Sequence, residues 1–173
     1  MSRSIMARIP RGAGISRPHF PHPLSVNVWW AASARYTAEP VFYTDTLTGG
    51  RYASILHSSL RPLLQRSKNT CRLLQNNLPV HYTAACRQFY ECWDITVLRD
   101  FPPYSPDLQP IENRFDIAKL EVDRLAPTTQ AELRAAVRKG LKKVTVAIRS
   151  AALLHMPRRL KFVLENNGSY SSH

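Results

Sequence analysis

Strand-like and helical segments alternate along most of this 173-residue chain. β-Branched and aromatic residues are frequent in 26–30, 41–43 and 95–98, which predicts strands because such residues favour a pleated conformation. The segment Cys71-Arg72-Leu73-Leu74 is predicted to be a further short strand. Between and after these segments, apolar residues recur every three or four positions, the spacing of one helix face. The order strand–strand–helix–strand–helix–strand–helix predicts an α/β fold built on one central sheet.

The predicted helices differ in how clearly the sequence marks them. The clearest begins at Thr129–Glu132, the pattern of a capping box, and continues as an apolar stripe over 133–148. Apolar spacing predicts another helix over 52–64, which Pro62 must bend or end because proline lacks a backbone N–H. A third helix is predicted over 84–92.

Two segments are predicted to lack regular structure. Four prolines and two glycines interrupt residues 1–23, which show no apolar period. Four further prolines between 102 and 110 prevent regular structure until Ile111, where a helix is expected to begin with Pro110 near its first turn.

The chain is strongly basic, with 24 lysines and arginines against 12 acids and a net charge of +12. Such an excess favours polyanionic partners, with nucleic acid first and an anionic membrane second, although a solvated basic surface accounts for it as well. No apolar run is long enough to span a bilayer, which excludes an integral membrane protein. Three cysteines do not make a disulfide framework, so a reducing compartment is favoured.

The charge is unevenly distributed. Residues 91–123 carry eight acids and three bases, whereas 128–162 carry nine bases and one acid. Seven of these bases lie along the C-terminal helices and are predicted to contact DNA phosphates: Arg134, Arg138, Lys142, Arg149, Arg158, Arg159 and Lys161. The alternative is that they solvate helices whose apolar sides pack on the sheet.

Two other residue groups have simpler explanations than a binding site. His81, Cys86 and Cys92 are spaced around a helix without a fourth ligand, so buried structural cysteines are favoured over a zinc site. Trp29 and Trp30 are predicted to pack in the core of a strand rather than to stack on nucleic acid bases.

Two tracts carry a family resemblance: FPPYSPDLQPIENRFD at 101–116 and LQNNLPVH at 74–81. Together they resemble the catalytic half of the mariner-type transposases, the DDE superfamily endonucleases, and VNVW at 26–29 and MPRRL at 156–160 extend the match over residues 24–173. The resemblance implies a ribonuclease-H-like mixed sheet flanked by helices. It also implies three carboxylates that hold two Mg²⁺ or Mn²⁺ ions for DNA cleavage and strand transfer.

The resemblance assigns catalytic and metal-binding roles to two positions. The third carboxylate is Glu112, and the second falls on position 76, which is Asn76 rather than aspartate. The first aspartate is expected upstream of Val26, yet no acid precedes Glu39. We therefore expect the first strand of the sheet to be missing and metal binding and catalysis to be lost. The alternatives are a non-specific DNA-binding remnant and a relic product without activity.

The resemblance also divides the chain and suggests its setting. Residues 1–23 would be an irregular basic segment, 24–125 a partial DDE catalytic domain, and 126–173 a basic helical extension of that domain. It implies DNA as a partner and a homodimer. The lack of a bilayer-spanning apolar run and of a secretory signal predicts no membrane contact and a nuclear or cytoplasmic rather than secreted location.

Overall fold

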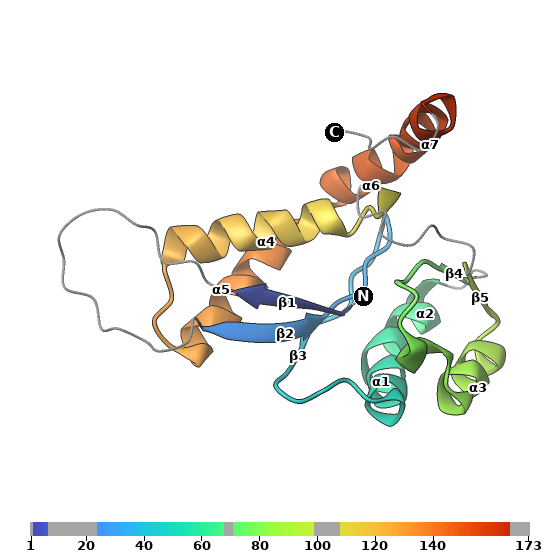
Figure 1. Ribbon diagram of the computed structural model, residues 1–173, viewed down its shortest axis with the longest axis horizontal. Helices are drawn as coiled ribbons and strands as arrows, with labels where there is room; N and C mark the ends of the chain where they lie inside the picture. The colour runs from blue at the N-terminus through green and yellow to red at the C-terminus, as the bar shows by residue number, and fades with distance from the viewer. Residues whose placement is uncertain (1, 7–23, 68–70, 99–107, 167–173) are drawn as a thin grey trace.

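The computed structural model describes residues 2–6, 24–67, 71–98 and 108–166, and it confirms the α/β class (Figure 1). Its strands are β1 (Ser2–Met6), β2 (Ser25–Trp29), β3 (Val41–Tyr43), β4 (Cys71–Leu73) and β5 (Ile95–Val97). Its helices are α1 (Gly49–Ile55), the π-helix η1 (Leu56–Leu60), α2 (Arg61–Ser67), the 3₁₀ turn η2 (Pro79–Tyr82), α3 (Ala84–Cys92), α4 (Glu112–Leu125), α5 (Gln130–Lys142), α6 (Val146–Leu154) and α7 (Met156–Glu165).

The strands form two sheets, where the sequence predicts one. Strands β1, β2 and β3 make an antiparallel sheet in that order, and β4 pairs with β5 in parallel. Each strand of the parallel pair is only three residues long, so the pair offers few free backbone groups to a further strand.

Strand β1 corrects two expectations about the start of the chain. Ser2–Met6 pairs with β2 from Ser2 opposite Trp29 to Met6 opposite Ser25, so a strand does precede β2 and this part of residues 1–23 is regular. The prolines on which the irregular structure was predicted all follow Met6. Pairing with β1 supplies β2 with ladder hydrogen bonds on the side that β3 does not occupy. The other residues of 1–23, like 99–107, lie outside the described residues.

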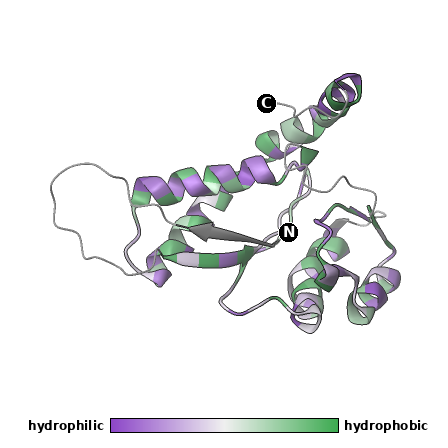
Figure 2. Cartoon of the chain, in the orientation of Figure 1, coloured by the Kyte–Doolittle hydropathy of each residue, from purple (hydrophilic) through white to green (hydrophobic). Residues whose placement is uncertain are grey.

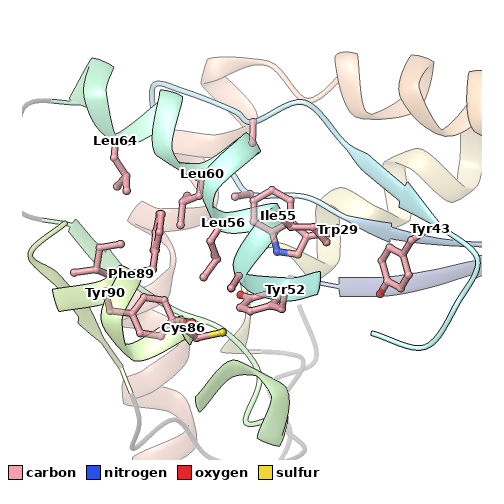
Figure 3. Packing of buried hydrophobic residues seen from close by; sticks show 14 residues of the cluster. Trp29, Tyr43, Tyr52, Ile55, Leu56, Leu60, Leu64, Cys86, Phe89 and Tyr90 are labelled. Carbon is pink, nitrogen blue, oxygen red and sulfur yellow. The ribbon is translucent and has the colours of Figure 1, made fainter. Parts of the chain in front are cut away.

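Strand β2 separates two hydrophobic cores, because successive side chains of a strand point to opposite faces. Val26, Val28 and Trp30 pack against α4 and α5. Trp29 lies on the other face, among residues of α1, η1 and α3 (Figure 3). Trp29 and Trp30 are 1% and 2% exposed, which confirms that both are core residues.

The predicted helix over 52–64 is a continuous run of three helical segments. The π-helix η1 lies between α1 and α2, and Pro62 follows it in the first turn of α2. Proline cannot donate the hydrogen bond of a helix interior, and a π turn is one way in which a helix absorbs such a defect.

The predicted helix that begins at Thr129 and carries the apolar stripe over 133–148 is broken. The capping box at Thr129 and Glu132 is present, but α5 ends at Lys142, and Thr145 caps a new helix by accepting a hydrogen bond from the Ile148 backbone N–H. The break changes the helical phase, so Ile148 is exposed although the stripe predicts it to be buried.

The helices differ in how closely they pack on the rest of the protein. Helices α4 and α5 pack against each other and α5 contacts β2, whereas α7 projects from the body and buries none of its residues (Figure 1). Figure 2 shows apolar and polar residues alternating along α4, as expected of a helix with one covered face. Within the described ranges, no helix combines the length and apolar character needed to cross a membrane.

Candidate functional site

A buried polar network holds the chain that follows β4. The Gln75 side chain is 1% exposed; its Oε1 accepts a hydrogen bond from the Tyr52 hydroxyl at 2.7 Å, and its Nε2 donates to the Tyr90 hydroxyl oxygen at 3.2 Å. Tyr52 comes from α1 and Tyr90 from α3 (Figure 3). Gln75 therefore ties the chain end of β4 to two helices that lie far from it in the sequence.

His81 holds the backbone of Asn76, the residue that follows Gln75 in the chain. Its ring is fully buried, its Nδ1 lies 2.8 Å from the Asn76 carbonyl oxygen, and its ring plane lies over Tyr52 with centroids 4.2 Å apart. A carbonyl oxygen can only accept, so Nδ1 carries the proton. Burial lowers the pKa of His81 to about 4, so the ring is neutral at pH 7.

Asn76 itself presents an unpartnered acceptor. Its Oδ1 atom is buried and has no hydrogen-bond partner among the described residues, and the same is true of His81 Nε2. A buried polar atom without a partner costs free energy, so the Asn76 Oδ1 atom destabilises the fold unless a ligand supplies its partner. An amide oxygen is a possible metal ligand, but it carries no charge.

Glu112 lies at the first turn of α4 and is half-buried. The structure brings the end of β4 and the start of α4 together, because Leu74 and Ile111 line the same cavity. Asn76 and Glu112 do not line that cavity themselves. In the part of the chain that the structure describes, no group of three histidine, cysteine or acidic side chains is placed to hold a metal ion.

These donors do not fit two divalent ions. Magnesium and manganese prefer several anionic oxygen ligands, and the two predicted positions supply one carboxylate and one neutral amide. Strand β1, which pairs with β2 at the edge of the sheet, has the sequence Ser-Arg-Ser-Ile-Met and contributes no acid. A site with about +4 of metal charge would therefore be under-neutralised.

Arg149 departs from its predicted role in phosphate binding. It is 7% exposed, and its guanidinium donates to the carbonyl oxygens of Ala34 at 3.2 Å, Arg35 at 3.1 Å and Val144 at 2.6 Å. The helix break before Thr145 turns this side chain inward. Arg149 thus ties α6 to the loop after β2, and little of its side chain is exposed to solvent.

The other residues that were predicted to contact phosphates differ in their exposure to solvent. On α5, Arg138 and Lys142 are exposed, with the Arg138 guanidinium 4.7 Å from the Phe42 ring centroid, whereas Arg134 is half-buried. On α7, Arg158 and Lys161 are exposed and Arg159 is half-buried. Lys161 also lies 3.6 Å from the Glu165 carboxylate. The structure therefore separates the predicted set into two exposed pairs on two helices.

A charged cluster that sequence analysis missed joins α4 to α5. The Glu121 side chain is 2% exposed and pairs with Arg124 at 2.6 Å, with Lys143, and with Lys139 at 3.7 Å. Hydrogen bonds from Arg124 and Lys143 lower its pKa to about 2. Glu121 follows Phe115 and Ala118 on α4 at steps of three residues, which places all three on the covered face of the helix. This spacing could have predicted from the sequence that Glu121 is buried.

Comparison with known proteins identifies the family. Residues 14–134 match the family described as DDE superfamily endonuclease. The chain belongs to this family. Over 94 residues the DDE-family chain is 31% identical to the Transposable element Tc3 transposase of Caenorhabditis elegans, in an alignment that covers 54% of this chain and 28% of that relative.

Solved structures agree in fold. The catalytic domain of Mos1 mariner transposase is 19% identical with a TM-score of 0.73, covering 88% of this chain and 78% of that one. The Mos1 strand transfer complex gives 19% identity and a TM-score of 0.75, covering 99% of this chain and 54% of that one. Mos1 catalytic-domain structures have been determined with Mg and with Mn. The DDE-family chain thus spans about a quarter of its curated relative and about half of the longer Mos1 chain.

Proposed function

We propose that this DDE-family chain does not cleave DNA and instead binds it without sequence preference through exposed basic residues of α5 and α7. The observation that carries the first half is the asparagine at position 76, held by the buried network where the family resemblance places an aspartate. The acid-free strand β1 supports the same conclusion. A nuclear location belongs to this proposal, because DNA is the partner.

A cleavage assay tests the loss of catalysis. We expect the purified chain with Mg²⁺ or Mn²⁺ to cut supercoiled DNA no faster than a buffer control. Asn76→Asp should not restore cutting, because it raises the number of carboxylates at the two predicted positions only from one to two. Metal-dependent nicking that disappears in Glu112→Gln would overturn the proposal and restore the endonuclease interpretation.

The DNA-binding half of the proposal rests on exposed charge. Arg138 and Lys142 are one helical turn apart on α5, and Arg158 and Lys161 lie on the projecting helix α7. The net charge of +12 supports electrostatic attraction to a polyanion. The competing explanation is that these side chains only solvate their helices. All the proposed contacts are made to phosphates, which are the same for every base sequence, so binding is expected to show no sequence preference.

Salt-dependent binding separates the two explanations. Fluorescence anisotropy with a duplex oligonucleotide should give a micromolar or weaker Kd at physiological salt, with a log–log salt slope of about −0.9 per phosphate contact. Charge reversal of Arg138 and Lys142 to glutamate should weaken binding and reduce the slope by about 2.

The matched control reverses Arg66 and Arg87, two exposed arginines on α2 and α3, and so changes the net charge equally. An equal loss of affinity in both double variants would show that DNA affinity depends on net charge and not on the position of the α5 residues. Unchanged binding in the α5 variant would rule out the α5 contacts and leave the solvated-face explanation for that helix.

A further inference from the structure

A cavity of about 290 Å³ lies between the loop after β2, the η1–α2 run, β4 and the start of α4. Its walls are mainly apolar, with Ala31, Leu60, Leu74 and Ile111 from four different segments of the chain. No carboxylate is among the described residues that line it. The cavity is therefore a preformed apolar space that the proposed DNA contacts do not use.

One buried cation, Arg114, lines this cavity and has an unpartnered guanidinium nitrogen. Arg114 of α4 is 3% exposed; its Nη2 donates to the Arg149 carbonyl oxygen at 3.0 Å, but its Nη1 is buried and has no partner among the described residues. Burial first, then repulsion from Arg149 and Arg159, lowers the pKa of Arg114. A buried charge left unpaired is strongly unfavourable, so an anion placed against this guanidinium would be stabilising.

The rim of the cavity adds a second cation. Arg72 of β4 lines the cavity and is exposed, as are Ser33 and Leu153, so the space opens to solvent. Two guanidinium groups match a group that carries close to two negative charges, and phosphate does so at neutral pH whereas a carboxylate does not. The apolar walls suit an organic body attached to that group.

From this geometry we infer that the cavity between β4 and α4 binds a phosphomonoester. The Arg114 guanidinium receives the phosphate oxygens, Arg72 neutralises the remaining charge at the rim, and the organic part of the ligand rests on the apolar walls. The phosphate can come from a free nucleotide or from the 5′-phosphorylated end of a DNA strand. The inference does not depend on the proposed DNA contacts, because Arg138, Lys142, Arg158 and Lys161 do not line the cavity.

Ligand titration of the full chain tests the inference. Thymidine 5′-monophosphate, added at millimolar concentration, should raise the Tm, and thymidine should not, because only the former carries the phosphate. A 5′-phosphorylated single-stranded tetranucleotide, compared with its unphosphorylated form, distinguishes the sources. If only the phosphorylated tetranucleotide binds, the ligand is a DNA end, and if only the mononucleotide binds, it is a free nucleotide.

Three variants locate the effect. Arg72→Gln should raise the Kd for the phosphorylated probe roughly tenfold, since a hydrogen bond to a charged group contributes about that factor. Arg114→Met should abolish phosphate-dependent binding while the variant folds with unchanged or higher Tm, because it removes an unpaired buried charge. Arg87→Gln, an exposed arginine on α3, is the control and should bind as the unmodified chain does.

Two results would overturn the inference. Equal protection by thymidine and its monophosphate would show that phosphate is not recognised. An equal loss in Arg72→Gln and Arg87→Gln would show that only overall charge is sensed. If Arg114→Met does not fold, the comparison of Arg72→Gln with Arg87→Gln still decides the question.

Discussion

Gly140 marks the closest approach of α5 to α4, and Gly140→Ala should destabilise the protein. A Cβ built on Gly140 would lie 2.5 Å from the Ala118 Cα and 3.1 Å from the Ala118 carbonyl oxygen. Ordinary contacts of such an atom begin at 3.4 Å, so α4 and α5 would have to move apart by about 1 Å. The nearest atom belongs to the backbone, which cannot rotate away as a side chain does.

The magnitude follows from two opposing effects. Alanine stabilises a helix interior relative to glycine by about 1 kcal/mol. Overpacking costs about 1–3 kcal/mol, and we take the upper end because a gap of about 1 Å weakens dispersion contacts along the whole helix pair. The free energy of unfolding should therefore fall by about 2 kcal/mol. For a chain of this length the Tm should fall by about 4–8 °C.

Urea unfolding followed by circular dichroism measures this change, and two variants check the reasoning. Gly50→Ala adds a Cβ with no atom within 4 Å, so its stability should be unchanged or higher. Ala118→Gly added to Gly140→Ala should not restore stability, because the closest atom is the Ala118 Cα rather than its Cβ. Full rescue, or a Gly140→Ala variant as stable as the unmodified chain, would refute the close-approach argument.

Three further predictions concern buried polar groups. The hydrogen-bonded cations around Glu121 lower its pKa to about 2, so their stabilising effect should be complete above pH 4.5 and lost as the pH falls toward 2. Glu121→Gln should therefore reduce the change of the urea unfolding midpoint with pH in this range. Burial lowers the pKa of His81 to about 4, so as the pH falls the unfolded chain binds a proton at this residue before the folded chain does. The free energy of unfolding should therefore decrease as the pH falls from 6.5 to 4, and His81→Asn should reduce this pH dependence. Tyr52→Phe removes the 2.7 Å hydrogen bond to Gln75 and should lower the free energy of unfolding by about 1–3 kcal/mol, measured by urea titration at pH 7.

Local patterns were sufficient for most elements of the fold. The strand at 41–43 and the capping box at Thr129 were predicted at the positions where the structure has them, because propensity and capping depend on residues a few positions apart. The family motifs at 74–81 and 101–116 likewise identified the superfamily. The same local reasoning missed β1, since it judged residues 1–23 by prolines that all follow Met6.

Only the tertiary structure decided which charges are buried and what they contact. The stripe over 133–148 predicted one helix with Arg149 outward, but the break before Thr145 changed the phase and turned Arg149 toward carbonyls more than 100 residues away in the chain. Helical spacing on α4 could indicate that Arg114 lies near the covered face, yet its unpartnered Nη1 depends on elements that α4 alone does not specify. The sequence by itself determined the elements and the family, because those depend on neighbouring residues. The buried network at Asn76 and the cavity at Arg114 needed the fold, because their partners meet only when distant segments pack together.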